Sequence, residues 1–158
     1  MLADTHLRGG IDRLPGALCR AMERADAVVH AGDVVSAEAL AGMQALCPLH
    51  AVLGNNDGEL VGVLPERLSL VLGGVSVGVV HDSGPSAGRA GRMARLFPDA
   101  QLVIFGHSHA PVRAPGVGGQ RLFNPGSPLQ RRAQPKHTFG RLRLEDGRIA
   151  RQAVVTLD

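Results

Sequence analysis

Short apolar runs alternate with helix-like patterns along the chain. Three runs rich in aliphatic and β-branched residues are each followed within two residues by a glycine, which is typical of buried strands. They span residues 27–30, 49–53 and 101–105. Apolar residues at helical spacing predict three further segments to be helices. Their apolar positions are Ile11, Leu14, Leu18 and Met22 in the first, Leu40, Met43, Leu46 and Cys47 in the second (with Ser36 as its N-cap), and Met93, Leu96 and Phe97 in the third.

Turn residues divide the remaining apolar segments into hairpins. Asp146 and Gly147, a strong two-residue turn signal, separate residues 141–144 from 148–155. Glycine-rich turns separate residues 68–72 from 75–80 and residues 112–114 from 120–123. We therefore expect a β-α-β-α-β first half, followed by mostly antiparallel strands and one helix. This order predicts one α/β domain over residues 1–158, with two packed sheets, outer helices and a short first strand at residues 1–3.

Composition narrows the class of protein. The 158 residues are 44% apolar and 20% charged, which excludes a disordered chain. No apolar run reaches the ~18 residues of a membrane span, so no membrane partner is expected. Two cysteines and the lack of a signal-peptide pattern favour a reduced, cytoplasmic protein. The net charge is +3, but aromatic residues make up only 3%, so nucleic acid is not an expected partner.

Side chains of metal-ligand type follow the predicted strands. In open α/β sheets, ligands collect beyond the carboxyl ends of the strands. The i, i+2 spacing of Asp4 and His6 places both side chains on one side of an extended segment, and His107 and His109 can converge in the same way if that stretch stays extended. Glycines before Asp33, Asn55 and His107 let the backbone turn sharply and approach an ion. The candidate ligands are Asp4, His6, Asp33, Asn55, His81, His107 and His109.

The chemistry of this donor set favours a transition metal. Carboxylate, amide and imidazole donors without a thiolate suit Mn, Fe, Zn or Ni, and the set is too rich in nitrogen for Ca or Mg alone. Seven donors are more than one tetrahedral ion uses. Two ions that share a carboxylate, ~3.5–4 Å apart, would use them all.

The motifs D-x-H, G-D, G-N-x-D, H and G-H-x-H, in this order, resemble the calcineurin-like metallophosphoesterase superfamily. The small size and the later Asn124-Pro125-Gly126-Ser127 are similar to the small YfcE-like phosphodiesterases. The resemblance implies a four-layer α/β/β/α sandwich of two mixed β-sheets flanked by helices. It also implies that Asp33 bridges two ions. One ion would be held by Asp4, His6 and His109, and the other by Asn55, His81 and His107.

This resemblance implies a metal-dependent phosphodiesterase that cleaves small, nucleotide-like phosphodiesters through a hydroxide shared by the two ions. We expect two Mn²⁺ ions, with Fe, Zn and Ni as alternatives. Asn56 is the predicted catalytic residue. It stands where relatives carry His or Cys, and an amide can donate a hydrogen bond but not a proton. The identity of any general acid, Asp82 included, stays open.

Two other classes of function remain as alternatives. The first is a weakly catalytic interaction scaffold, since a retromer subunit has this fold. The second is a nuclease or phosphomonoesterase of the same superfamily. A competent donor at all seven ligand positions favours the enzyme. A homo-oligomer is compatible with the sequence.

Other polar residues are expected to have structural roles. His30 shares a strand with Asp33 but has the opposite parity, so it should point away from that carboxylate. Asp57 should orient the loop before it. Arg89, Arg92 and Arg95 should form a solvated helix face, and residues 124–127 a turn beside the metals.

Overall fold

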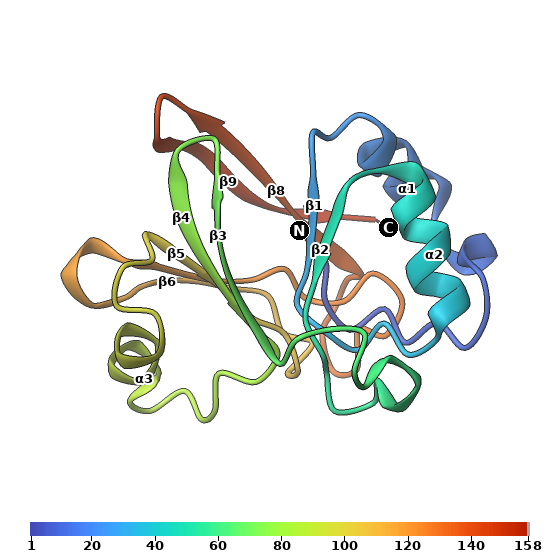
Figure 1. Cartoon of the computed structure of the whole chain (residues 1–158), viewed down its shortest axis with the longest axis horizontal. Coiled ribbons are helices and arrows are strands. Elements are labelled where there is room, and N and C mark those ends of the chain that lie inside the picture. The colour runs from blue at the N-terminus through green and yellow to red at the C-terminus, as the bar shows by residue number, and fades with distance from the viewer. Residues whose placement is uncertain (158) are drawn as a thin grey trace.

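Three apolar clusters separate four layers of secondary structure (Figure 1). The computed structural model describes residues 1–157. Helices α1 (Gly16–Glu23) and α2 (Ala37–Leu46) form the first layer, and they cover a sheet built on β1 (Val28–His30) and β2 (Leu49–Ala51). The first cluster fills the space between these helices and this sheet, with Leu18, Met22, Leu40 and Met43 among its buried members.

The second sheet has five strands in the order β3-β4-β5-β7-β6. Its strands are β3 (Arg67–Leu72), β4 (Val75–Val80), β5 (Leu102–Ile104), β6 (Val112–Pro115) and β7 (Arg121–Asn124). Helix α3 (Arg89–Leu96) covers its outer face (Figure 1). Side chains alternate along residues 102–105. Leu102 and Ile104 pack in the cluster between the sheets, while Val103 and Phe105 pack in the cluster under α3. A strand covered on both faces is apolar at every position, which explains this run.

The N-terminal segment connects the first sheet to the last hairpin. Leu2 forms a parallel bridge with His30 of β1. The N-terminal ammonium group of Met1 donates to the Gly140 carbonyl, and the Met1 carbonyl accepts from the Gly140 N–H, both at 2.8 Å. Gly140 belongs to β8 (Thr138–Glu145), which pairs with β9 (Arg148–Thr156) around Asp146 and Gly147 as predicted. The predicted four-layer sandwich of mixed sheets is confirmed.

The first predicted helix is shorter than its apolar pattern suggests. A 3-10 turn η1 (Ile11–Arg13) precedes Leu14, which is extended with ψ of 135°. The residue before a proline is pushed out of the helical region, so Pro15 separates this turn from α1. The prediction of one pattern running from Ile11 to Met22 was therefore wrong at its start. The second helix is confirmed, and its N-cap Ser36 accepts a hydrogen bond from the Ala39 N–H at 3.1 Å.

The second half of the chain contains more parallel strand pairing than predicted. Strands β4, β5 and β7 run parallel to one another, and only β3–β4, β6–β7 and β8–β9 are antiparallel pairs among the described strands. The crossover through α3 returns the chain to the start of β5, which makes β4 and β5 parallel. Two further 3-10 turns lie in loops, η2 (Gly58–Leu60) and η3 (Val117–Gly119). None of the helices within residues 1–157 is long and apolar enough to cross a bilayer.

Candidate metal centre

The seven predicted ligands lie in loops that directly follow parallel segments of the two sheets. Asp4 follows the N-terminal bridge, Asp33 follows β1 and Asn55 follows β2. His81 follows β4, and His107 and His109 follow β5. Parallel strands end at the same edge of a sheet, and the two sheets face each other. The sandwich therefore brings these loops together.

Five of these side chains are held by a left-handed backbone. Asp4, His6, Asp33, His107 and His109 have φ values between 48° and 67°. Non-glycine residues rarely adopt this conformation, and they do so mostly at functional sites. The expected extended geometry is therefore wrong for D-x-H, and H-x-H does not meet the condition of staying extended. Asp4 and His6 still converge, whereas His107 and His109 turn to different partners.

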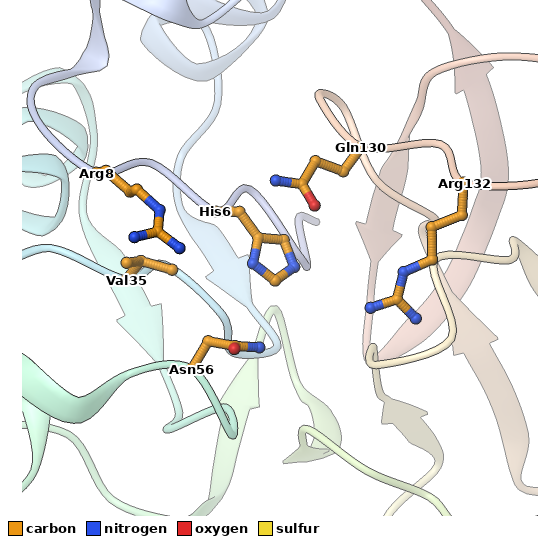
Figure 2. Close-up of a pocket in the computed structure, with 6 residues that line it drawn as sticks. All are labelled: His6, Arg8, Val35, Asn56, Gln130 and Arg132. Atoms are coloured by element: carbon orange, nitrogen blue, oxygen red, sulfur yellow. The ribbon is translucent and has the colours of Figure 1, made fainter.

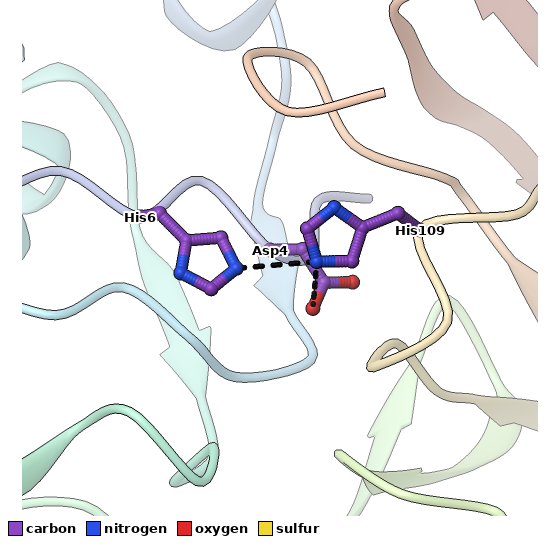
Figure 3. Close-up of side chains that lie close together, drawn as sticks. All are labelled: Asp4, His6 and His109. Carbon is purple, nitrogen blue, oxygen red and sulfur yellow. Dashed lines mark hydrogen bonds and ion pairs between the residues drawn. The ribbon is translucent and has the colours of Figure 1, made fainter. Parts of the chain in front are cut away.

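The first ligand set comes together in one place (Figure 3). The Nε2 atoms of His6 and His109 are 3.2 Å apart. The Nε2 atom of His109 is also 3.5 Å from Oδ1 of Asp4. Asp4 and His6 lie on one irregular segment and His109 on another, and Asp4 and His109 are almost completely buried. Asp4, His6 and His109 are the three residues assigned to one ion by the family resemblance.

The second ligand set converges on the side-chain oxygen of Asn55. This Oδ1 atom lies 2.9 Å from Nε2 of His81 and 3.0 Å from Nδ1 of His107. Asp33 lies between the two sets, since its Oδ2 atom is 3.4 Å from Nε2 of His6 and 3.5 Å from Nε2 of His81. One buried carboxylate therefore reaches both sets. Asp4, Asp33 and His81 also form a compact group of potential ligand atoms.

Backbone carbonyls orient two of the imidazoles. His81 Nδ1 lies 2.7 Å from the Ala31 carbonyl, and His109 Nδ1 contacts the Gln130 carbonyl. A ring N–H that donates to a carbonyl leaves the other ring nitrogen with a free lone pair. Metal-binding histidines are usually oriented in this way. Sequence analysis missed both contacts, because a backbone carbonyl has no residue-type signature.

The polar atoms of the centre suit a cation. Oδ2 of Asp4 is buried and has no hydrogen-bond partner among residues 1–157. Nε2 of His81 faces the oxygen atoms of Asn55 and Asp33, and Nε2 of His109 faces that of Asp4. When Nδ1 carries the proton on both rings, each Nε2 atom is an acceptor that faces an acceptor oxygen. A proton or a metal ion between them must offset this repulsion, and the nitrogen and oxygen donors fit a divalent transition metal.

Burial and close charged neighbours shift the pKa values of the candidate ligands. Burial raises the pKa of Asp4 to about 7, and the nearby Asp33 adds to this effect. Burial also tends to raise the pKa of Asp33, but hydrogen bonds from His81 and Asn56 outweigh it and hold that pKa below its usual range. Burial lowers the pKa of His6 and of His109. The pKa of His81 is raised, since its contacts with Asp33 and the Ala31 carbonyl outweigh burial.

Glycine is required where two of these loops approach the ligands. A Cβ atom on Gly54 would lie 2.2 Å from Oδ1 of Asp33. Gly32 has φ of 86°, and a Cβ atom there would lie 2.7 Å from Nδ1 of His81. The sequence-based expectation that these glycines permit a close approach agrees with this geometry.

Asp57 and Asn56 hold the loop after β2 against Asp33. The Asp57 carboxylate accepts backbone hydrogen bonds from Asp33 (2.9 Å), Gly54 (2.6 Å) and Val35 (2.7 Å). It therefore orients the loop, as predicted. Asn56 donates to the Asp33 carboxylate through its backbone N–H at 2.8 Å and through Nδ2 at 2.7 Å.

The other predicted structural residues behave in different ways. His30 is fully buried and contacts the Thr5 hydroxyl at 3.1 Å. Ser127 bonds to the Asp4 carbonyl at 2.7 Å, so residues 124–127 pack beside the centre as expected. The solvated role predicted for Arg92 was wrong. Its guanidinium donates to the carbonyls of Ser83, Pro85 and Ala87, because the loop after His81 folds back over α3.

A pocket of about 380 Å³ opens beside His6 (Figure 2). Asn56 forms one wall, so the predicted catalytic residue faces the same space as a predicted ligand. Arg8, Val35, Gln130 and Arg132 line the rest. Sequence analysis did not find Arg8 or Arg132, because neither belongs to a recognisable motif.

The sequence is similar to known phosphoesterases. A family model described as the calcineurin-like phosphoesterase superfamily domain matches residues 1–147. A probable metallophosphoesterase from Methanocaldococcus jannaschii is 30% identical over 149 residues, which cover 92% of this chain and 75% of that protein.

Two solved structures illustrate the likeness in fold. A novel archaeal phosphodiesterase has a TM-score of 0.72 at 24% identity, covering 98% of this chain and 97% of that chain. Vps29 from Entamoeba histolytica, complexed with Zn²⁺, has a TM-score of 0.74 at 21% identity, covering 99% and 97%.

Proposed function

Since this chain belongs to the calcineurin-like phosphoesterase superfamily, we propose that it is a two-metal phosphodiesterase acting on small substrates. One observation carries the proposal. The buried Asp33 carboxylate lies within 3.5 Å of imidazole nitrogens from both ligand sets. A single carboxylate shared by two complete sets is the arrangement that a dinuclear site needs.

The residues that would hold the ions follow from these contacts. Asp33 would be shared between Asp4, His6 and His109 on one side and Asn55, His81 and His107 on the other. We favour Mn²⁺, with Fe, Zn and Ni as alternatives, because imidazole and carboxylate donors occur together without a thiolate. Two divalent ions would supply Lewis-acid activation of the phosphoryl group and of water.

The pocket offers hydrogen-bond donors but no acid outside the ligand sets. Asn56 can donate from Nδ2, and Arg8 and Arg132 offer guanidinium N–H groups, which are hydrogen-bond donors rather than general acids. The departing oxygen would therefore leave without a protein proton. This favours phosphodiesters with good leaving groups, since a positioned general acid is worth ~10²–10⁴-fold in rate.

A series of aryl and alkyl phosphodiesters tests this proposal. We expect the Mn²⁺-loaded protein to cleave nitrophenyl diesters readily and simple alkyl diesters poorly. The Asn56→His variant should reduce the difference in rate between nitrophenyl and alkyl diesters, because it adds a titratable donor. Gln44→His, at an exposed position of α2, is the matched control and should leave this difference unchanged. Ca²⁺ should restore little activity, because it takes oxygen ligands.

Two results would contradict the proposal. Full activity in the presence of a chelator would exclude metal-dependent hydrolysis. A rate that is nearly independent of the leaving group, with chemistry rate-limiting, would mean that a general acid exists elsewhere. Asp82 would then be the first residue to replace.

An interaction scaffold is the second candidate function. The likeness in fold to Vps29 raises this alternative, and Val61 and Val63 expose 71% and 64% of their surface close to the loop that carries Asn55. Metal binding does not distinguish the enzyme from the scaffold, because that Vps29 structure also contains Zn²⁺. Turnover of a phosphodiester distinguishes them.

A further inference from the structure

Two arginines face the pocket beside the metal centre from opposite sides. Figure 2 shows the guanidinium groups of Arg8 and Arg132 reaching toward the space in front of His6, with Gln130 and Asn56 closing it above and below. Arg8 follows His6 by two residues, and Arg132 comes from the long loop after β7. Segments far apart in the sequence therefore place two positive charges around one small pocket.

Within residues 1–157, no carboxylate forms an ion pair with Arg8 or Arg132. Arg8 also makes no side-chain hydrogen bond to these residues. The one side-chain bond of Arg132 runs from Nη1 to the His107 carbonyl at 3.3 Å. Both side chains are solvent-exposed, so their donors remain free to bind a ligand.

Charge balance indicates that the arginines serve more than the scissile phosphate. The proposed ligand sets contain two carboxylates, Asp4 and Asp33, against the four positive charges of two divalent ions. A shared hydroxide and a phosphodiester carry one negative charge each, so the centre is already balanced without an arginine. Arg8 and Arg132 add two more positive charges next to it. An anionic group on the second arm of the substrate would offset this excess positive charge, and guanidinium groups bind carboxylates and phosphates with paired hydrogen bonds.

Recognition of a nucleobase has less support in this pocket. The chain contains no Trp or Tyr, and Phe97, Phe105, Phe123 and Phe139 are all buried in the core. An aromatic side chain is the usual platform for a base, and none of these lines the pocket. The lining is dominated by polar and charged groups instead.

We propose that Arg8 and Arg132 form an anion subsite, which selects phosphodiesters whose second ester arm carries a carboxylate or a phosphate. This inference rests on the proposed phosphodiesterase function and specifies its substrate class. The scissile phosphate binds at the metal centre, and the acidic arm extends into the pocket between the two guanidinium groups.

Matched substrates test the subsite directly. The 3-carboxypropyl, 3-phosphonopropyl and butyl esters of p-nitrophenyl phosphate share one leaving group and differ in the charge of the other arm. For the Mn²⁺-loaded protein, kcat/KM should be about tenfold or more higher for an acidic arm than for butyl. Comparing the two acids separates a carboxylate subsite from a phosphate subsite.

Substitutions then assign the preference to the two arginines. Arg8→Gln and Arg132→Gln should each lower the acidic-to-butyl ratio of kcat/KM by about fivefold or more, mostly through KM. Arg20→Gln, an exposed position on α1, is the control and should leave the ratio unchanged. A wild-type ratio near one, or a ratio that survives both substitutions, would overturn the inference.

A binding measurement separates this inference from the proposed function. Titration calorimetry measures affinity without relying on turnover. The two ligands are 4-carboxybutylphosphonic acid and pentylphosphonic acid, each as the monomethyl ester of its phosphonate group, so that only the first carries a free carboxylate. Tighter binding of the acid, lost in Arg8→Gln, would support the subsite even if no ester were hydrolysed. Hydrolysis without any preference for the acid would retain the proposed function and reject the subsite.

Discussion

At the scale of a single residue, the buried side chain of Asp4 lowers the stability of the folded protein. Its side chain is completely buried, Oδ2 has no hydrogen-bond partner among residues 1–157, and burial raises its pKa to about 7. The ordinary pKa of this group is 3.8. In the metal-free protein the carboxylate therefore weakens the folded state increasingly as the pH rises from 3.8 to about 7.

The Asp4→Asn variant should relieve this penalty. At pH 8 we expect the metal-free variant to be more stable than the metal-free wild type by about 2–4 kcal/mol, since one pKa unit corresponds to about 1.4 kcal/mol. The difference should shrink as the pH falls below 7, where the wild-type carboxyl becomes protonated. Urea unfolding at pH 5 and pH 8 measures this, with the exposed Asp12→Asn as the control. Equal stability at pH 8 would contradict the account.

The residues that sequence could predict are those whose side chains are of metal-ligand type. Asp4, His6 and His109 converge, and Asn55 meets His81 and His107. The left-handed backbone that turns these side chains was not predictable, because Asp and His carry no local signal that requires it. The contacts of the Ala31 and Gln130 carbonyls could not be predicted either, because a backbone carbonyl has no residue-type signal. These two carbonyls orient two of the imidazoles.

At the scale of elements, the centre depends on loops that are tied to one another. The Asp57 carboxylate, on the loop after β2, accepts N–H groups from Asp33 and Val35 on the loop after β1. It also closes its own turn through Gly54. One buried side chain therefore fixes the distance between two loops that carry predicted ligands.

The Asp57→Asn variant should loosen this link. An amide has one acceptor oxygen, so its NH₂ group would face a backbone N–H and leave a buried donor unsatisfied. We expect a loss of about 1–3 kcal/mol in unfolding free energy, together with weaker Mn²⁺ binding. Thermal unfolding and metal titration measure the two effects. Asp82→Asn is the matched control, because exposed Asp82 accepts a single local bond from Gly84. A wild-type Mn²⁺ affinity in Asp57→Asn would refute the role of this link.

Element boundaries were predictable only where local chemistry decides them. Ser36 caps α2 and Asp146-Gly147 turns the last hairpin, as their residue types require. Pro15 should have separated η1 from α1, but the apolar spacing from Ile11 to Met22 hid that break. The parallel pairing of β4, β5 and β7 depends on a crossover, which no short-range signal reveals.

At the scale of the whole molecule, the four layers explain why such distant segments can share a site. The cluster between the sheets includes Ala3, Val29, Val79 and Ile104, each within a few residues of a predicted ligand. Packing these strands face to face brings their carboxyl ends to one edge. The order of the motifs along the chain matched the superfamily, so this global arrangement was predictable by resemblance rather than by local pattern.

The most direct test of the account is the Mn²⁺ content of the wild type and of Asp33→Asn, measured with turnover of bis(p-nitrophenyl) phosphate on the same samples. We predict about two ions per chain and measurable turnover for the wild type. Asp33→Asn should retain one ion or fewer and lose at least ~100-fold in turnover, because the shared charged ligand is gone. Asp33→Asn protein with near-normal metal content and near-normal turnover would contradict the dinuclear centre.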